Sequence, residues 1–135
     1  MFRTLILVAT LALGGCMSPP VDLDLSRERA TVDHRYAVKV RPMGEPIALG
    51  KLHSWEVSVR QPSGQPVTGA RFAVDGGMPQ HHHGLPTQPQ VTRELGDGRY
   101  LLEGVKFSMS GWWELKLKID AAPGPDKVTF NLVLP

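Results

Sequence analysis

The chain has 135 residues, and its 15 Lys and Arg against 13 Asp and Glu give a formal net charge of +2. The charges are scattered along the chain, so they give no electrostatic reason to expect nucleic acid as a partner. With a single cysteine, Cys16, the chain can form neither an internal disulfide nor a site of several thiolates, so one domain has to be held by its apolar core.

The first fifteen residues have the pattern of a secretion signal. A cationic start at Arg3 is followed by a mostly apolar run over residues 5–13 and then by Gly14 and Gly15. The apolar run is about half of the ~20 residues that a helix needs to cross a bilayer, which argues against a permanent membrane span. We therefore expect residues 1–15 to be a signal peptide.

The signal ends in Leu13-Gly14-Gly15-Cys16, which resembles the bacterial lipobox. That resemblance implies that the Cys16 thiol is acylated and that Cys16 becomes the new N-terminus. A secreted protein with an incidental cysteine is the alternative. The resemblance implies a membrane partner through the lipid on Cys16 and a location in the cell envelope. In a host with two membranes, we expect the periplasmic side of the outer membrane.

Residues 16–33 are polar and acidic and contain Pro19-Pro20. Because they have few apolar side chains to bury, we expect a flexible tether that carries the lipidated Cys16. The folded domain is then expected over residues 34–135.

From residue 34 onward, short runs alternate apolar and polar residues between Gly and Pro, and no long window keeps a helical period. This pattern predicts an all-β fold, an immunoglobulin-like antiparallel β-sandwich of about seven strands, with a small closed barrel as the alternative. The expected strands cover residues 36–40, 53–60, 70–74, 100–105, 111–120 and 128–134, with another beginning near residue 91. The expected core layer is Trp55, Val57, Val59, Phe72, Val74, Tyr100, Trp113, Leu115, Leu117, Phe130 and Leu132.

Residues 75–86 read as a loop with metal-binding side chains. His81 and His83 are expected to project together, because alternate residues of an extended backbone point the same way. Met78 precedes them by a short distance. Imidazole suits copper, zinc and nickel, and a thioether favours Cu(I), so this set predicts copper as Cu(I) or Cu(II). Met78 can equally be structural, and Asp75 reads either as a partner of a histidine or as part of an Asp-Gly-Gly turn.

The stretch from about residue 55 to 119 resembles the YtkA-like family of small exported β-sandwich domains, relatives of FixH-like proteins. The similarity lies in residues 77–84 (GMPQHHHG), 98–100 (GRY) and 107–115 (FSMSGWWEL). It implies an immunoglobulin-like fold with its Met/His loop at one end, and a link to copper handling or respiratory-oxidase assembly. We expect FixH-like proteins to be anchored by a transmembrane helix, whereas this chain is expected to carry a lipid.

The resemblance also points to Met109, which the family pattern places just before the Gly-Trp strand, where its thioether could close a site against the loop. Counting in steps of two along the chain puts Met109 on the same face as Trp113, so a core methionine is the other interpretation.

These observations favour a membrane-tethered envelope lipoprotein that binds copper through His81 and His83, with Met78 or Met109 assisting. The alternative is a structural or protein-interaction module whose loop contacts an envelope protein and has no metal role. We do not expect an enzyme, because the chain has no Gly-rich phosphate loop, no serine elbow and no His-Glu-x-x-His pattern.

Overall fold

The computed structural model describes residues 17–135. The expected signal peptide and the expected lipidation site Cys16 lie outside the described residues. The elements are β1 (Glu28–Ala30), β2 (Ala37–Pro42), β3 (Leu52–Arg60), β4 (Arg71–Met78), the 3-10 helix η1 (Pro79–His81), β5 (His83–Gly84), β6 (Gln90–Gly96), β7 (Arg99–Lys106), β8 (Gly111–Asp120) and β9 (Asp126–Leu134).

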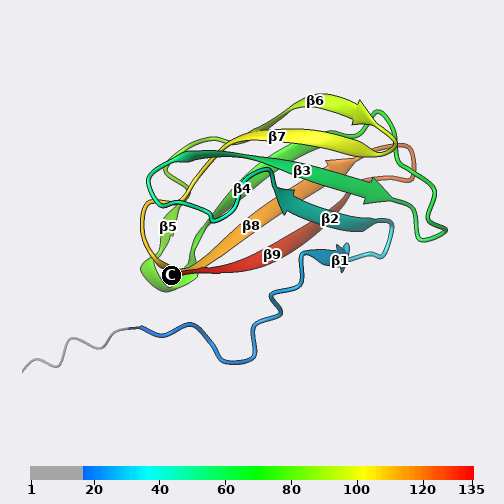
Figure 1. Ribbon diagram of the computed structural model, residues 1–135. Helices are drawn as coiled ribbons and strands as arrows, with labels where there is room; N and C mark the ends of the chain where they lie inside the picture. The colour runs from blue at the N-terminus through cyan, green and yellow to red at the C-terminus, as the bar shows by residue number, and fades with distance from the viewer. Residues whose placement is uncertain (1–16) are drawn as a thin grey trace, which may run out of the picture.

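The strands form two antiparallel sheets that pack face to face (Figure 1). One sheet has the order β1-β2-β3-β7-β6 and the other the order β5-β4-β8-β9. The predicted antiparallel β-sandwich is therefore confirmed. The two strands beyond the expected seven are β1 and β5, which have three and two residues. Within residues 17–135, no helix is long and apolar enough to cross a membrane.

The core lies between the two sheets and follows the predicted alternation. Nine of the eleven expected core residues are buried, and Trp55 and Trp113 are the largest of them. Burial of side chains of this size stabilises the fold by about 1.5 to 3 kcal/mol each. Phe72 and Val74 are only partly buried. They lie in β4, whose outer neighbour β5 pairs with only its last two residues, so β4 is an edge strand over most of its length.

Strand β4 is longer than the sequence predicts. Asp75, Gly76 and Gly77 were expected to form part of the loop, and the turn was one interpretation, but all three pair with β8 in regular register. The turn interpretation is wrong, because the two glycines lie within a β-sheet, where they allow the backbones of neighbouring strands to come close together. A Cβ on Gly76 would collide with the carbonyl oxygen of Glu114, and one on Gly77 would collide with that of His83. β4 thus carries the chain onward to the end of the sandwich.

The end of the expected tether is part of the folded domain. Residues 28–30 form β1, which pairs with β2, and Thr31 is buried. Strand β1 is a short edge strand that is held by backbone hydrogen bonds, so it needs no alternating apolar pattern. This is why residues 28–31 read as tether in the sequence.

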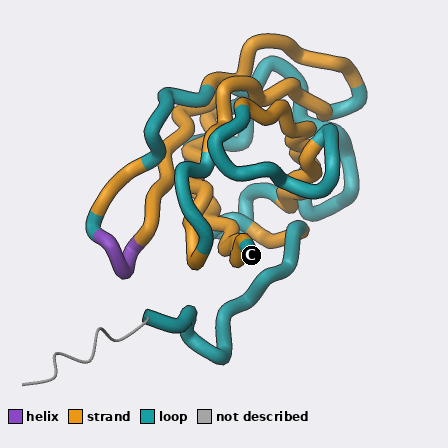
Figure 2. The backbone as a smooth tube through the Cα atoms, turned by 60° about the vertical axis from the view of Figure 1, so that its left-hand side comes forward, coloured by secondary structure: helices purple, strands orange, loops and turns teal. Residues whose placement is uncertain are grey.

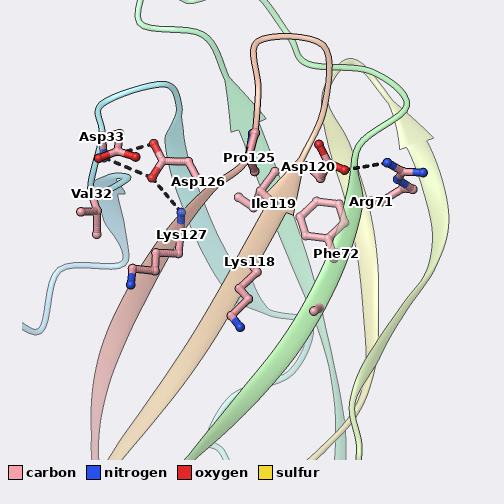
Figure 3. A pocket seen from close by; sticks show the side chains of 11 residues that line it. Val32, Asp33, Arg71, Phe72, Lys118, Ile119, Asp120, Pro125, Asp126 and Lys127 are labelled. Atoms are coloured by element: carbon pink, nitrogen blue, oxygen red, sulfur yellow. Dashed lines mark hydrogen bonds and ion pairs between the residues drawn. The ribbon is translucent and has the colours of Figure 1, made fainter.

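Asp126 joins the β1–β2 turn to the start of β9 at one end of the sandwich (Figure 3). Its carboxylate accepts hydrogen bonds from the backbone amides of Asp33, Arg35 and Lys127, at 3.1, 3.2 and 2.8 Å. Burial raises the pKa of Asp126, but these amides and the Thr31 hydroxyl outweigh it and lower the pKa to about 2. The charged carboxylate therefore stabilises the fold.

Replacing Asp126 with Asn should lower the free energy of unfolding at pH 6 by about 2 kcal/mol, because the folded state holds the charged form. A depressed pKa contributes stability above the unfolded value of 3.8 that is lost as pH falls toward about 2. Denaturant unfolding of both proteins should therefore show a gap that closes over this range. A gap that does not change with pH would contradict this role of Asp126.

Candidate metal site

The Met/His loop forms one end of the sandwich, together with the β7–β8 connection and the C-terminus (Figure 1). β4 leads into η1, and β5 then returns to pair with the end of β4. Figure 2 shows η1 as the tip of this projecting segment. Pro79 begins η1 and fixes the backbone φ that the helical turn needs. The stretch that reads as a loop is thus a short, ordered turn.

His81 and His83 lie close together at this tip. Their ring centroids are 6.0 Å apart, with 29° between the ring planes. The predicted extended backbone is wrong: His81 ends η1, and His82 turns the chain through a left-handed conformation with φ 54°. An imidazole nitrogen sits about 2 Å from a bound ion such as zinc, so two imidazoles on one ion have centroids roughly 5 to 6 Å apart. The two rings are therefore spaced as a shared ion requires.

The ring of His83 is held in a defined orientation. Its Nδ1 lies 3.0 Å from the carbonyl oxygen of Gly84, and a carbonyl only accepts, so Nδ1 carries the proton in this contact. The ring also packs edge to face on Trp113, with centroids 5.6 Å apart. A neutral imidazole with Nδ1 protonated presents Nε2 as a free acceptor, which is the form that binds metal.

Trp113 links this histidine to Met109. The indole Nε1 donates a hydrogen bond of 2.9 Å to the carbonyl oxygen of Met109, and the ring also packs on Phe107 with centroids 5.3 Å apart. The Met109 side chain is 39% exposed. The core interpretation of Met109 is wrong, because residues 107–110 are a loop and the alternation of β8 does not extend across it. Met109 thus offers an accessible thioether at this end.

Met78 lies in the core and is only 1% exposed. A Cβ on Gly111 would lie 2.9 Å from the Met78 Cε, so the glycine that begins β8 leaves room for this methyl group. The structure therefore favours the packing role of Met78 over the predicted ligand role, because an ion at the exposed histidines would have to draw the side chain out of the core.

The nearby carboxylates are already engaged. Glu114 forms an ion pair of 2.9 Å with Lys116, and this contact raises the pKa of the Lys116 ammonium. The Asp75 carboxylate accepts a hydrogen bond from the amide of Gly76, at 2.7 Å. Residues 17–135 contain no group of three or more His, Cys, Asp or Glu side chains that could hold a metal. A metal site here would therefore be a pair of histidines completed by a thioether or by another molecule.

The two histidines outside this turn, His34 and His53, contact other parts of the fold. His34 occupies a left-handed position in the β1–β2 turn, at the opposite end of the sandwich. His53 lies 2.8 Å from the carbonyl oxygen of Ala48 through Nε2, which ties the β2–β3 connection to β3. Both histidines have a place in the fold that needs no metal.

Sequence reasoning missed the contact partners that orient the candidate ligands. Trp113 was predicted as a core residue, and it is one, but its contact with His83 joins segments that are far apart in the sequence. The carbonyl of Gly84 was missed for another reason, since a backbone acceptor has no sequence signal of its own.

Together, the fold and this end define a small β-sandwich domain that displays a Met/His turn beside its core. A model of the YtkA-like family matches residues 32–118, well over half of the chain. No curated protein matches the sequence, and no solved structure matches it. The chain belongs to the YtkA-like family.

The two methionines should respond differently to truncation. Met78→Ala should lower the free energy of unfolding by about 2 to 5 kcal/mol, because it leaves a cavity in the core. Met109→Ala should change it by less than about 1 kcal/mol, because this side chain is partly exposed. Chemical denaturation of both variants measures the difference. Equal losses would show that the two side chains do not have the assigned places.

Proposed function

We propose that this protein is a lipid-anchored module of the cell envelope that binds copper and passes it on. His81 and His83 are the principal ligands, and Met109 supplies a third. The observation that carries this proposal is the paired, exposed imidazoles 6.0 Å apart, one of which is held with Nε2 free by the Gly84 carbonyl. Binding and transfer need no reaction of their own, so the proposed role is not enzymatic.

The donor set favours copper over other ions. Two imidazoles suit copper, zinc and nickel alike, whereas the added thioether of Met109 suits Cu(I) best. Zinc at a structural site takes four ligands, and the exposed turn brings fewer side chains together. An ion held by two or three ligands at the surface can be handed to a partner. This supports transfer, such as delivery to a metalloenzyme or oxidase during assembly.

The anchor follows from the sequence around Cys16. Leu13-Gly14-Gly15-Cys16 resembles a lipobox, and the polar residues after it lead to the first strand. A lipid on Cys16 would hold the domain at the periplasmic side of the outer membrane in a host with two membranes. A lipid on Cys16 would leave the chain without a free thiol, so histidine and methionine side chains would have to bind the copper.

The copper proposal is tested by titrating the purified protein with Cu(I) in competition with a chelator, and separately with Cu(II) and Zn(II). We expect sub-micromolar Cu(I) affinity, which His81→Ala/His83→Ala should reduce at least 100-fold, or by about 3 kcal/mol of binding free energy. Met109→Leu should weaken the binding of Cu(I) more than the binding of Zn(II), since a thioether is a soft ligand.

The matched control is His82→Asn. It removes an imidazole from the same turn, and Asn tolerates the left-handed conformation that residue 82 adopts. Copper affinity should stay as in the unmodified protein. Copper binding that survives loss of His81 and His83, or that depends on His82 instead, would contradict the assignment of His81 and His83 as ligands. A loop that recognises a protein partner without metal would then be the remaining function.

A further inference from the structure

The two ends of the sandwich differ in their exposed apolar side chains. Nine large apolar side chains are exposed within residues 17–135. Five of them lie at the Met/His end: three in or beside the β2–β3 connection, one in the β7–β8 connection and one near the end of β9. The opposite end carries only Val32, and the other three lie before β1, in residues 17–25. The five are Met43, Leu49, Leu52, Met109 and Val133.

Positive charge lies beside these apolar side chains. Lys51 and Lys106 lie beside the apolar residues of the Met/His end, and neither makes an ion pair within the described residues. Glu45 at this end is paired with Arg27 at 2.8 Å. We call the five exposed apolar side chains of this end the apolar rim. Apolar side chains beside unpaired lysines suit the surface of a bilayer, where lysine reaches the headgroups and apolar side chains enter the boundary between headgroups and acyl chains.

The tether leads to this same end. Figure 1 shows the chain before β1 extending below the sandwich toward the side on which the C-terminus lies. The Asn131 amide donates to the carbonyl oxygen of Asp24 at 3.1 Å, and the Gln80 amide donates to that of Ser18 at 2.8 Å. Gln80 lies in η1, directly before His81. Two hydrogen bonds therefore place Ser18 and Asp24 of the expected tether beside this end of the domain.

We propose that the Met/His end of the domain rests on the bilayer that holds the Cys16 lipid, with Leu49 and Leu52 at the lipid boundary. This rests on the anchoring part of the proposed function. Two residues of chain span at most about 7 Å, so a lipid on Cys16 is confined to that distance from Ser18. The anchor and the apolar rim then act on the same surface.

This orientation places the histidine pair at the membrane surface. An ion bound there would be exchanged with a molecule that reaches the membrane surface, such as the exposed part of a membrane protein. The opposite end, which carries Asp33, Asp97 and Asp120 in ion pairs with arginines, faces away from the bilayer.

The test uses the lipidated protein in vesicles of phosphatidylethanolamine and phosphatidylglycerol that contain a small fraction of nitroxide-headgroup lipid. Acylated Cys16 has no free thiol, so Ser110→Cys and Ser63→Cys each provide one labelling site for a bimane fluorophore. Ser110 lies at the Met/His end and Ser63 at the opposite end, about 30 Å away along the strands. We expect the nitroxide lipid to quench the label at residue 110 several-fold more strongly than that at residue 63.

Two further variants test the apolar contact itself. Leu52→Glu places a charge on the rim and should reduce quenching of the residue-110 label, because a carboxylate at an anionic surface is repelled. Val32→Glu is the control, since Val32 is exposed to a similar degree, 61% against 68%, but lies at the opposite end. It should leave the quenching unchanged.

Mass measurement of the purified protein separates the two proposals. An intact lipid on Cys16 with equal quenching at both labels, or with none, overturns the bilayer contact alone and leaves the apolar end free for a protein. A mass without lipid overturns the anchor as well. If the protein binds no copper but the label at residue 110 is still quenched more strongly than that at residue 63, the orientation stands and the metal role is rejected.

Discussion

The indole of Trp113 is the contact on which both the fold and the candidate site depend. Its ring is fully buried between the sheets and packs on Phe107, so it belongs to the core. Its edge meets His83, and its Nε1 holds the backbone of Met109. The candidate ligand His83 is thus supported by a rigid side chain of the sandwich, which helps to fix its geometry on a projecting turn.

Most of the fold could be predicted from alternation alone, because an antiparallel sheet with one face in the core leaves a period of two in the sequence. β8 is the clearest case, since its predicted bounds, 111–120, are those observed. β1 could not be found, as an edge strand is held by backbone groups that leave no such pattern. The pair Gly76-Gly77 misled for a related reason: glycine permits both a turn and close packing of strands, and only the tertiary contacts decide between them.

The candidate site was less accessible to sequence reasoning. The composition of the turn pointed to His81 and His83, but the geometry that joins them comes from η1 and from the left-handed His82, not from an extended strand. Steps of two along the chain suggested a core position for Met109, and Met78 was left undecided between a ligand and a structural role. The structure exposes Met109 in part and buries Met78. Periodicity fails at Met109 because this residue lies in the loop between β7 and β8. Contacts across the end of the sandwich can be read only from the folded chain.

Copper held by this histidine pair is the central claim, and nitrogen NMR of the imidazole rings tests it most directly. Cu(I) is diamagnetic, so spectra of the 15N-labelled protein can be compared before and after loading. The account predicts that a ring nitrogen of His81 and Nε2 of His83 shift on loading, while Nδ1 of His83 stays protonated against Gly84 and the rings of His34, His53 and His82 are unchanged. Unshifted His81 and His83 rings, or a shift confined to other histidines, would contradict it.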